Sequence, residues 1–217
     1  MSIIKVENVH FGFDKPLWQG LNFTLEAGQR IGIRGPNGCG KSTLFNLLMG
    51  LNKLQCGRIW LNDVECLHET DFAGQRPSIG YLFQDPDDQL FCATVMEDVA
   101  FGPLNQGHSQ DQAREISLTV LEHLGLSGYE KRITYHLSGG EKRLVSLASV
   151  WAMQPQAFLL DEPSAFLDQD AQQHLIHILL NSDKGWLMIS HDMDFLQATC
   201  HEIWQVNDGS LYPCASL

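Results

Sequence analysis

The sequence predicts an α/β fold in which a mostly parallel sheet is joined to an N-terminal antiparallel sheet and interrupted by a helical insert. Apolar strands and helices alternate in the first 84 residues and again after residue 154, as is typical of a parallel sheet with crossover helices. Between these two parts the pattern is helical. The 217 residues, 44% of them hydrophobic, are enough to bury a large core.

The first part begins with a strand and a glycine-rich loop. Residues 21–25 alternate strictly between apolar and polar, as expected of a half-buried strand. Ile31 and Ile33 continue as a strand into the glycine-rich loop. The helix after the loop is predicted to run from Ser42 to Gly50. Two further segments are interpreted as strands, 58–61 and 79–83.

The middle part contains three helix starts of the capping-box type, in which a Ser or Thr is followed three residues later by Glu or Gln. Pro155 ends the last of these helices. The capping pairs are Thr94 and Glu97, Ser109 and Gln112, and Ser138 and Glu141.

Strands and helices alternate again after Pro155. The predicted segments are a strand ending at residue 160, a helix near 168–180, a strand at 186–189, a helix near 193–198 and a hairpin turn at 207–209. We therefore predict one domain of residues 1–217. In it, 1–84 and 154–217 form the core with its antiparallel sheet, and 85–153 form a helical subdomain.

Charge and composition exclude several classes of protein. Fourteen Lys and Arg against 26 Asp and Glu give a net charge of −12, which is unsuited to binding nucleic acid because phosphate contacts need clustered cations. The longest apolar runs are far shorter than the ~20 residues of a membrane span. The N-terminus has no signal-peptide core, and the six cysteines show no Cys-x-x-Cys spacing. We expect a cytosolic, reduced and soluble chain.

Residues 35–43 match the phosphate-loop pattern G-x-x-x-x-G-K-[ST] and lie where its mechanism requires, after a strand and before a helix. Glycines allow successive backbone N–H groups to turn toward one anion, and the helix N-terminus adds positive potential. Lys41 supplies a charge between the β- and γ-phosphates, and Ser42 offers a hydroxyl ligand to Mg²⁺. The alternative is a chance glycine turn. Alone, the motif indicates only a nucleoside triphosphate, because kinases, GTPases and ATPases share it.

Two acids follow the apolar strand that contains Phe158. Asp161 and Glu162 lie at its C-terminal end, the edge at which α/β sheets bind ligands. Asp161 is suited to hold Mg²⁺, and Glu162 would face a water that attacks the γ-phosphate. The alternative is that the two acids merely open a surface turn before Pro163.

The segment 137–141 (LSGGE) contains two glycines in the first turn of a predicted helix. Reciprocal capping accounts for Ser138 and Glu141. It leaves Gly139 and Gly140 unexplained, because each costs about 1 kcal/mol relative to Ala in a helix. Their use would be to expose helix-terminal N–H groups to an anion. Since the phosphate loop serves its own nucleotide, that anion would belong to another chain.

In this order the motifs resemble those of ABC-transporter ATPase subunits, and the similarity covers essentially the whole chain. The matching motifs are the Walker A loop (35–43), a Q-loop glutamine (Gln84), the LSGGE signature (137–141), Walker B with its glutamate (158–162), a D-loop (164–168) and a switch histidine (His191). The resemblance implies the ABC ATPase fold on a P-loop NTPase core. It also implies ATP and Mg²⁺ binding by a head-to-tail dimer, with each ATP between one subunit's Walker A loop and the other's signature.

The family's residue roles carry over by position. Those implied for catalysis are Glu162, which polarises water, His191, which contacts the γ-phosphate, and Gln84, which links the site to the membrane partner. Those implied for ATP binding are Phe13, Gly35, Asn37, Gly38, Cys39, Gly40, Lys41, Ser42 and Thr43. The Mg²⁺ ligands would be Ser42, Gln84 and Asp161. Those implied to contact the opposite subunit's ATP are Ser138, Gly139, Gly140, Glu141 and Asp168.

Two of these residues have plain structural alternatives. Phe13 falls where the family places an aromatic that stacks on adenine, but Phe11 is two residues away and core packing accounts for one of the two. His191 follows an apolar strand and can sense phosphate through a hydrogen bond, whereas most of the nine histidines are expected on the surface or in the core.

The segment 81–103 is similar to energy-coupling factor (ECF) ATPases and cobalt/nickel uptake ATPases. This similarity implies import of a transition-metal ion or a vitamin such as biotin, with a second ATPase subunit, a transmembrane coupling protein and a substrate-binding membrane component as partners. The chain would then lie peripherally at the cytoplasmic face of the membrane and bind no nucleic acid. Between Asp85 and Asp98 lie five acids, no Lys or Arg, and several apolar residues. A solvated loop is the alternative, but unopposed negative charge beside apolar groups suits a groove for a basic, amphipathic coupling helix.

The sequence departs from the family in two places. Leu144 stands where the family is usually basic, which implies a lost cation near the signature helix. The chain also ends soon after the predicted hairpin, which implies that dimerisation depends more on ATP or on membrane partners.

Two other functions compete with transport. A soluble P-loop kinase would need a mobile basic lid, and the sequence has no arginine-rich lid segment. An ABC protein of DNA maintenance or translation would need a coiled-coil insert or a second cassette, and neither heptads nor a duplication is present. Another class of ABC transporter also remains open.

Overall fold

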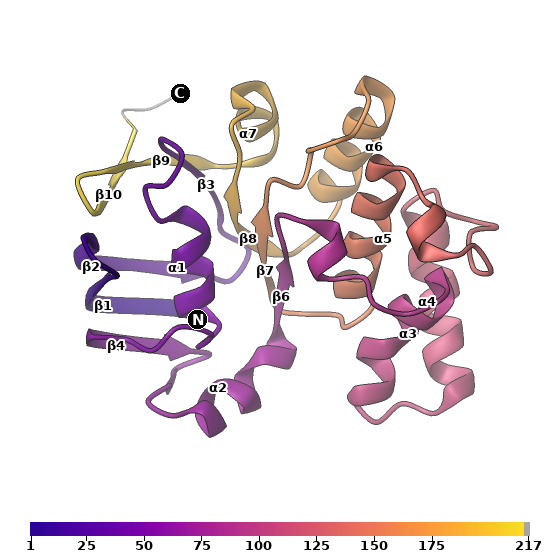
Figure 1. Cartoon of the computed structure of the whole chain (residues 1–217), viewed down its shortest axis with the longest axis horizontal. Helices are drawn as coiled ribbons and strands as arrows, with labels where there is room; N and C mark the ends of the chain where they lie inside the picture. Colours follow the sequence, from indigo (N-terminus) through magenta and orange to yellow (C-terminus); the bar gives the residue numbers. More distant parts are fainter. Residues whose placement is uncertain (215–217) are drawn as a thin grey trace.

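The computed structural model describes residues 1–214 and contains two sheets (Figure 1). The first is antiparallel, in the order β2-β1-β4-β5. Its strands are β1 (Ser2–Gly12), β2 (Pro16–Glu26), β4 (Cys56–Leu61) and β5 (Val64–Glu65). Along β2 the buried residues alternate with exposed ones, so one face packs on the core. The predicted N-terminal antiparallel sheet is therefore present.

The second sheet has the order β10-β9-β3-β8-β7-β6 and is parallel except for the pairing of β9 with β10. Its strands are β3 (Arg30–Arg34), β6 (Ile79–Leu82), β7 (Ala157–Asp161), β8 (Gly185–Ile189), β9 (Glu202–Asn207) and β10 (Ser210–Pro213). Both faces are covered. Leu159 and Leu187 face one hydrophobic cluster with the antiparallel sheet, whereas Phe158 and Trp186 face the other. Continuous apolar runs are typical of strands buried on both faces.

Helices cover this sheet and extend beyond it. They are α1 (Lys41–Leu48), α2 (Glu69–Gln75), α3 (Val95–Asn105), α4 (Gln110–His123), α5 (Gly139–Trp151), α6 (Gln169–Leu180) and α7 (Met193–Thr199), with short 3-10 turns η1 (Arg76–Ser78), η2 (Pro86–Asp88) and η3 (Thr134–His136). Figure 1 shows α3, α4 and α5 at the end of the molecule opposite the antiparallel sheet. They fall within the predicted helical subdomain, whose boundaries at 84/85 and 153/154 stay a prediction.

Three predicted helix starts are exact, and one helix was not predicted. Each predicted capping box forms, with hydrogen bonds in both directions at the starts of α3, α4 and α5. The helix α2 lacks the apolar repeat that would reveal it, because Phe72 is its one buried residue. Among the described residues, no helix is both long and apolar enough to cross a bilayer.

Candidate functional site

The phosphate loop lies between β3 and α1 with an uncapped helix end facing it. Gly40 is the N-cap residue of α1 and has a φ of 97°. In the described chain no side chain caps this end, and the first turn carries no acid, so its N–H groups and dipole are available to an anion. A Cβ added at Gly38 would meet nothing within 4 Å. The loop is therefore open to a ligand.

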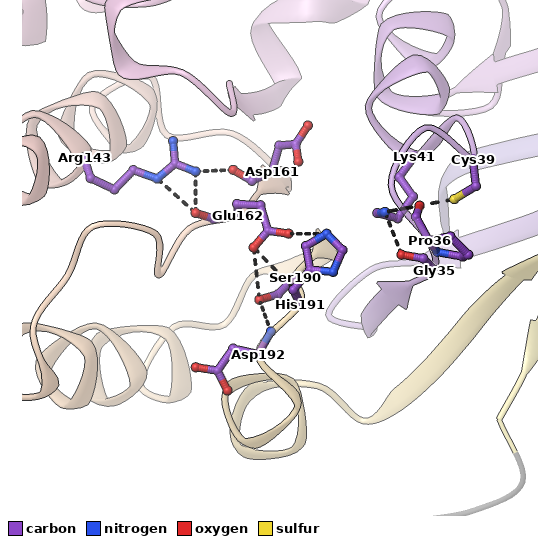
Figure 2. A network of polar contacts seen from close by, with 10 residues as sticks. All are labelled: Gly35, Pro36, Cys39, Lys41, Arg143, Asp161, Glu162, Ser190, His191 and Asp192. Atoms are coloured by element: carbon purple, nitrogen blue, oxygen red, sulfur yellow. Dashed lines mark hydrogen bonds and ion pairs between the residues drawn. The ribbon is translucent and has the colours of Figure 1, made fainter.

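Two contacts hold the loop in place. The buried Trp18 of β2 donates from Nε1 to the Gly40 carbonyl over 3.2 Å. Lys41 is 8% exposed, and its Nζ donates to the carbonyls of Gly35 and Pro36 over 2.9 Å each (Figure 2). Sequence reasoning did not find Trp18, because a buried aromatic in a strand looks like any core residue. The ammonium group of Lys41 is thus fixed within the loop.

A cavity of about 250 Å³ gathers most of the predicted nucleotide residues. Its walls come from the C-terminal edge of β3, β8, β7 and β6, where α/β sheets bind ligands. The residues that line it are Asn37, Gly38, Gly40, Lys41, Ser42, Thr43, Gln84, Asp161, Glu162, Ile189 and His191. Predicted phosphate, metal and water-activating residues therefore share one cavity.

Asp161 ends β7 and is 1% exposed. Its Oδ2 is buried and has no hydrogen-bond partner among the described residues. Burial raises the pKa of this carboxyl above its ordinary value, although Ser42 and the cations Arg143 and Lys41 act in the opposite direction. A buried carboxylate oxygen without a partner, beside the Ser42 hydroxyl, is suited to a hard cation.

Glu162 adopts a left-handed backbone conformation, with φ of 53°. Its Oε2 accepts from the Ser190 hydroxyl and the His191 backbone N–H, each over 3.4 Å, and its Oε1 lies 3.6 Å from His191 Nε2 (Figure 2). Burial raises the pKa of Glu162, and the hydrogen bond and charge of His191 oppose that rise. A non-glycine residue in this region is held there by its surroundings, as is common at functional sites.

Arg143 of α5 is a buried cation behind the two carboxylates, with 1% exposure. It donates to the carbonyls of Asp161 and Glu162 (Figure 2), and also to those of Phe83 and Gln84. Burial lowers the pKa of this guanidinium to about 10.

The signature helix therefore carries a buried cation one residue before Leu144, and the expected effect of Leu144 itself stays a prediction. Sequence reasoning missed Arg143. A basic residue inside a helix is usually solvated, and bonds to distant carbonyls leave no sequence pattern.

The signature residues lie at the start of α5. The Ser138 hydroxyl accepts from the Glu141 N–H over 3.3 Å, and Glu141 accepts from the Ser138 N–H over 2.8 Å and from Arg132 over 2.9 Å. Within the described residues, none of positions 138–141 lines the phosphate cavity. The structure therefore does not bring the signature to the phosphate loop of its own chain.

Packing against Phe166 gives a second reason for the two signature glycines, in addition to the anion binding expected from the sequence. A Cβ on Gly139 would lie 3.3 Å from Phe166 Cβ, and one on Gly140 would lie 2.9 Å from the Phe166 carbonyl oxygen. Phe166 itself is 70% exposed and has a φ of 66°. The loop that contains it ends at Asp168, whose side chain caps α6.

The two candidate aromatics differ in exposure. Phe11 is 6% exposed and belongs to the core, whereas Phe13 is 71% exposed and lies beyond the end of β1. Their rings meet edge to face with centroids 5.2 Å apart. The structure thus leaves Phe13 as the accessible ring of the pair.

A second cavity, of about 460 Å³, is a largely apolar groove beside the 83–91 segment. Exposed Phe91 and Phe101 pack edge to face in its wall, with centroids 4.8 Å apart. The groove is lined by Met49, Ala73, Arg76, Pro77, Ile79, Tyr81, Phe83, Asp88, Gln89, Phe91, Asp98, Phe101, Gly102, Ser149, Val150 and Met153. We call it the Phe91 groove.

The acids near this groove are less free than the sequence suggested. Asp87 pairs with Lys142 over 2.6 Å, and Glu97 caps α3. Asp98 is buried and accepts from the N–H groups of Phe91 and Cys92 and from the Thr134 hydroxyl. The expectation of unopposed negative charge was therefore wrong for Asp87, because Lys142 opposes it. Glu97 and Asp98 instead accept from neutral N–H and hydroxyl donors. Asp88 is exposed and lines the groove.

These features together define a P-loop nucleoside triphosphatase. A phosphate loop opens a helix, and two acids and a histidine follow neighbouring parallel strands at the same edge. A family model described as ABC transporter matches residues 18–165. The chain belongs to this family, and it is an ATP-binding cassette that hydrolyses ATP.

The chain is also similar to individual relatives within this family. It is 46% identical over 210 residues to a putative ABC transporter ATP-binding protein of Nitratidesulfovibrio vulgaris, covering 95% of this chain and 77% of that one. It is 36% identical to the energy-coupling factor transporter ATP-binding protein EcfA of Methanosphaera stadtmanae, covering 97% and 78%. The structure of cbiO1 from Clostridium perfringens, described as part of the ABC transporter complex cbiONQ, matches with a TM-score of 0.85 and 31% identity, covering 97% of this chain and 87% of that one. The predicted fold class is thereby confirmed.

Proposed function

We propose that this protein is the ATPase subunit of an energy-coupling factor importer that takes up a transition-metal ion such as cobalt or nickel, or a vitamin such as biotin. The similarity to EcfA and to cbiO1 supports this class. The observation that carries the proposal is the Phe91 groove, an apolar surface with an exposed acid directly beside the Q-loop segment. The chain would act at the cytoplasmic face of the membrane, bound to a transmembrane coupling protein and a substrate-binding membrane component.

In this proposal the phosphate loop binds the ATP of its own subunit. The N–H groups around Gly38 and Gly40 and the N-terminus of α1 receive the phosphates. Lys41 is already fixed in the loop and places its charge on the β- and γ-phosphates, while Phe13 offers an exposed ring to the adenine. The other residues proposed to bind ATP are Gly35, Asn37, Cys39, Ser42 and Thr43.

The residues present fit a Mg²⁺ ion. The buried, unpartnered Oδ2 of Asp161 and the nearby Ser42 and Gln84 supply oxygen ligands, and Mg²⁺ usually takes one or two carboxylates together with substrate phosphates. Among the described residues no cluster of three or more His, Cys, Asp or Glu side chains forms a metal cage. Bound Mg²⁺ supplies charge neutralisation to the phosphates.

Glu162 and His191 are proposed to carry the hydrolytic step. The Glu162 carboxylate, at the wall of the phosphate cavity, orients a water for attack on the γ-phosphate and accepts its proton. His191 lies 3.6 Å from that carboxylate and is exposed, so its ring can also reach the γ-phosphate. Gln84 lines the same cavity and connects it to the groove segment.

A second ATPase subunit would complete the site. Because the signature lies away from its own phosphate loop, its helix N-terminus is available to the nucleotide of a partner subunit. The residues proposed to reach that nucleotide are Ser138, Gly139, Gly140, Glu141 and Asp168. Closure of the dimer on ATP and reopening after hydrolysis would be transmitted to the membrane partner through the Phe91 groove.

The first experiment tests the nucleotide site. Lys41→Ala should abolish ATP binding measured by equilibrium dialysis, because it removes the buried charge in the loop. Arg30→Ala, which removes a cation at the other end of β3, is the matched control and should bind ATP. Normal affinity in Lys41→Ala would contradict the role of the loop.

The second experiment tests the membrane partner. Charge reversal at Asp87 and Asp88 should reduce co-purification of the transmembrane protein from solubilised membranes, because a basic helix would lose its acidic contacts. Asp88→Lys alone is the sharper variant, since Asp87 also pairs with Lys142. Asp111→Lys on the exposed start of α4 is the control. Unchanged assembly with retained ATP binding would remove the groove from the proposal.

A further inference from the structure

One buried guanidinium joins three segments of the candidate site. Arg143 extends from the signature helix α5 and donates only to main-chain carbonyls. Its Nη1 reaches Phe83 and Gln84 of the Q-loop segment, and its Nη2 and Nε reach Asp161 and Glu162. The Nε–Glu162 oxygen distance is 3.1 Å, and the Nη1–Gln84 oxygen distance is 3.3 Å.

Glu162 needs such support, because its left-handed backbone is unfavourable for a residue with a side chain. Its backbone is fixed at both ends. The Glu162 N–H donates to the Ile189 carbonyl over 2.8 Å, and its own carbonyl accepts from Arg143 through two nitrogens. The carboxylate between these anchors then meets Ser190 and His191. The direction of the side chain follows from the anchored backbone.

We propose that Arg143 is a positioning residue for ATP hydrolysis, holding the backbone of Glu162 so that its carboxylate faces the phosphate cavity. The inference rests on the proposed role of Glu162 in orienting water. In this role Arg143 contacts neither nucleotide nor water, and it acts through Glu162 alone. Its bond to the Gln84 carbonyl ties the same backbone to the Q-loop segment.

Only arginine can make this set of contacts from one position. Its planar guanidinium carries five N–H donors in a fixed fork, whereas a lysine ammonium carries three donors on one atom. The acceptors lie on two different chain segments, so a lysine at this position leaves buried carbonyls without donors. The backbone of Glu162 is then free to relax from its left-handed conformation.

The test is Arg143→Lys, which keeps the charge and loses the fork. We expect kcat for ATP to fall about 10- to 100-fold, because a displacement of about 1 Å of a catalytic group can cost about 100-fold. KM and the ATP dissociation constant should stay within about twofold, since the phosphate loop is untouched. Arg30→Lys is the matched control. Arg30 is also an arginine bonded to a carbonyl, that of Ser182, and it stacks on Trp186 rather than bonding to 161–162.

A double-mutant cycle separates positioning from general damage. In the Glu162→Gln background, single-turnover hydrolysis should show no further loss from Arg143→Lys, because the group that Arg143 positions is already removed. A further loss of the same size would mean that Arg143 acts independently, and it would overturn the proposal. An unchanged kcat in Arg143→Lys would also overturn it.

Circular dichroism checks that Arg143→Lys folds, and a second variant provides an independent control. Arg143→Gln keeps two N–H donors without a buried charge, and the same selective loss of kcat is expected. If neither variant folds, Arg143 serves fold stability alone and the proposal fails. If Glu162→Gln turns over ATP at the wild-type rate, the proposed role of Glu162 fails instead. If kcat falls in Glu162→Gln but is normal in Arg143→Lys, only the proposed role of Arg143 is overturned.

Discussion

Replacing Glu162 by glutamine isolates the chemical role of its carboxylate. The two side chains have nearly the same volume, and a glutamine oxygen can accept the same two hydrogen bonds from Ser190 and His191. The backbone anchors to Ile189 and Arg143 do not involve the side chain. The substitution therefore leaves the cavity shape and the phosphate loop intact, and it removes the ability to accept a proton.

The expected fall in kcat follows from the loss of this one function, the acceptance of a proton. A positioned acid–base group contributes about 10²- to 10⁴-fold, so kcat should fall at least about 100-fold, which corresponds to about 2.7 kcal/mol of barrier. ATP affinity should be unchanged. Phosphate release at saturating ATP, together with nucleotide binding by fluorescence, measures both quantities. A kcat within a few fold of wild type would refute the assignment, because water would then be activated by another group.

Three further outcomes follow from Glu162, Asp98 and Gly140. Burial raises the pKa of Glu162 above its ordinary 4.5, so the folded state favours the neutral acid. The neutral acid therefore stabilises the wild-type fold at pH values below 4.5, and this stabilisation is lost as the pH rises through the raised pKa. The Tm of Glu162→Gln relative to wild type should therefore increase from pH 4 to pH 8, and a difference independent of pH would contradict this reasoning. Asp98→Ala leaves three donors without an acceptor and should cost about 3 kcal/mol or more in urea unfolding, whereas Asp98→Asn should cost less than half as much. Gly140→Ala places a Cβ 2.9 Å from the Phe166 carbonyl and should cost about 1–3 kcal/mol, and a smaller loss would show that the Phe166 loop yields easily.

Local patterns predicted much of this fold because they depend on neighbouring residues. Each capping box involves residues three apart, and all three predicted boxes are present. The phosphate loop is equally local, since its pattern spans nine residues between a strand and a helix. Continuous apolar runs predicted the parallel strands, because burial on both faces removes polar positions.

The features that sequence reasoning missed depend on residues far apart in the chain. Arg143 bonds to carbonyls 18 to 60 positions away, and every residue type at those positions offers the same main-chain carbonyl. The bond from Trp18 to the Gly40 carbonyl leaves no sequence pattern for the same reason. Asp87 and Asp98 looked free because Lys142 and Thr134 come from other elements. Their partners become visible only once the chain is folded.

Tyr81 and Phe83 form a common wall between the Phe91 groove and a cavity of about 530 Å³ that contains Ser42, Gln84 and Asp161. The Tyr81 hydroxyl also donates to Asn46, on the helix that follows the phosphate loop. An occupant of the groove that displaces this wall changes the volume on its other side. If such an occupant changes the affinity for nucleotide by some factor, nucleotide must change the affinity for that occupant by the same factor, because the coupling free energy is reciprocal. Two aromatic rings on one short segment are thus the surface through which one occupied cavity would act on the other.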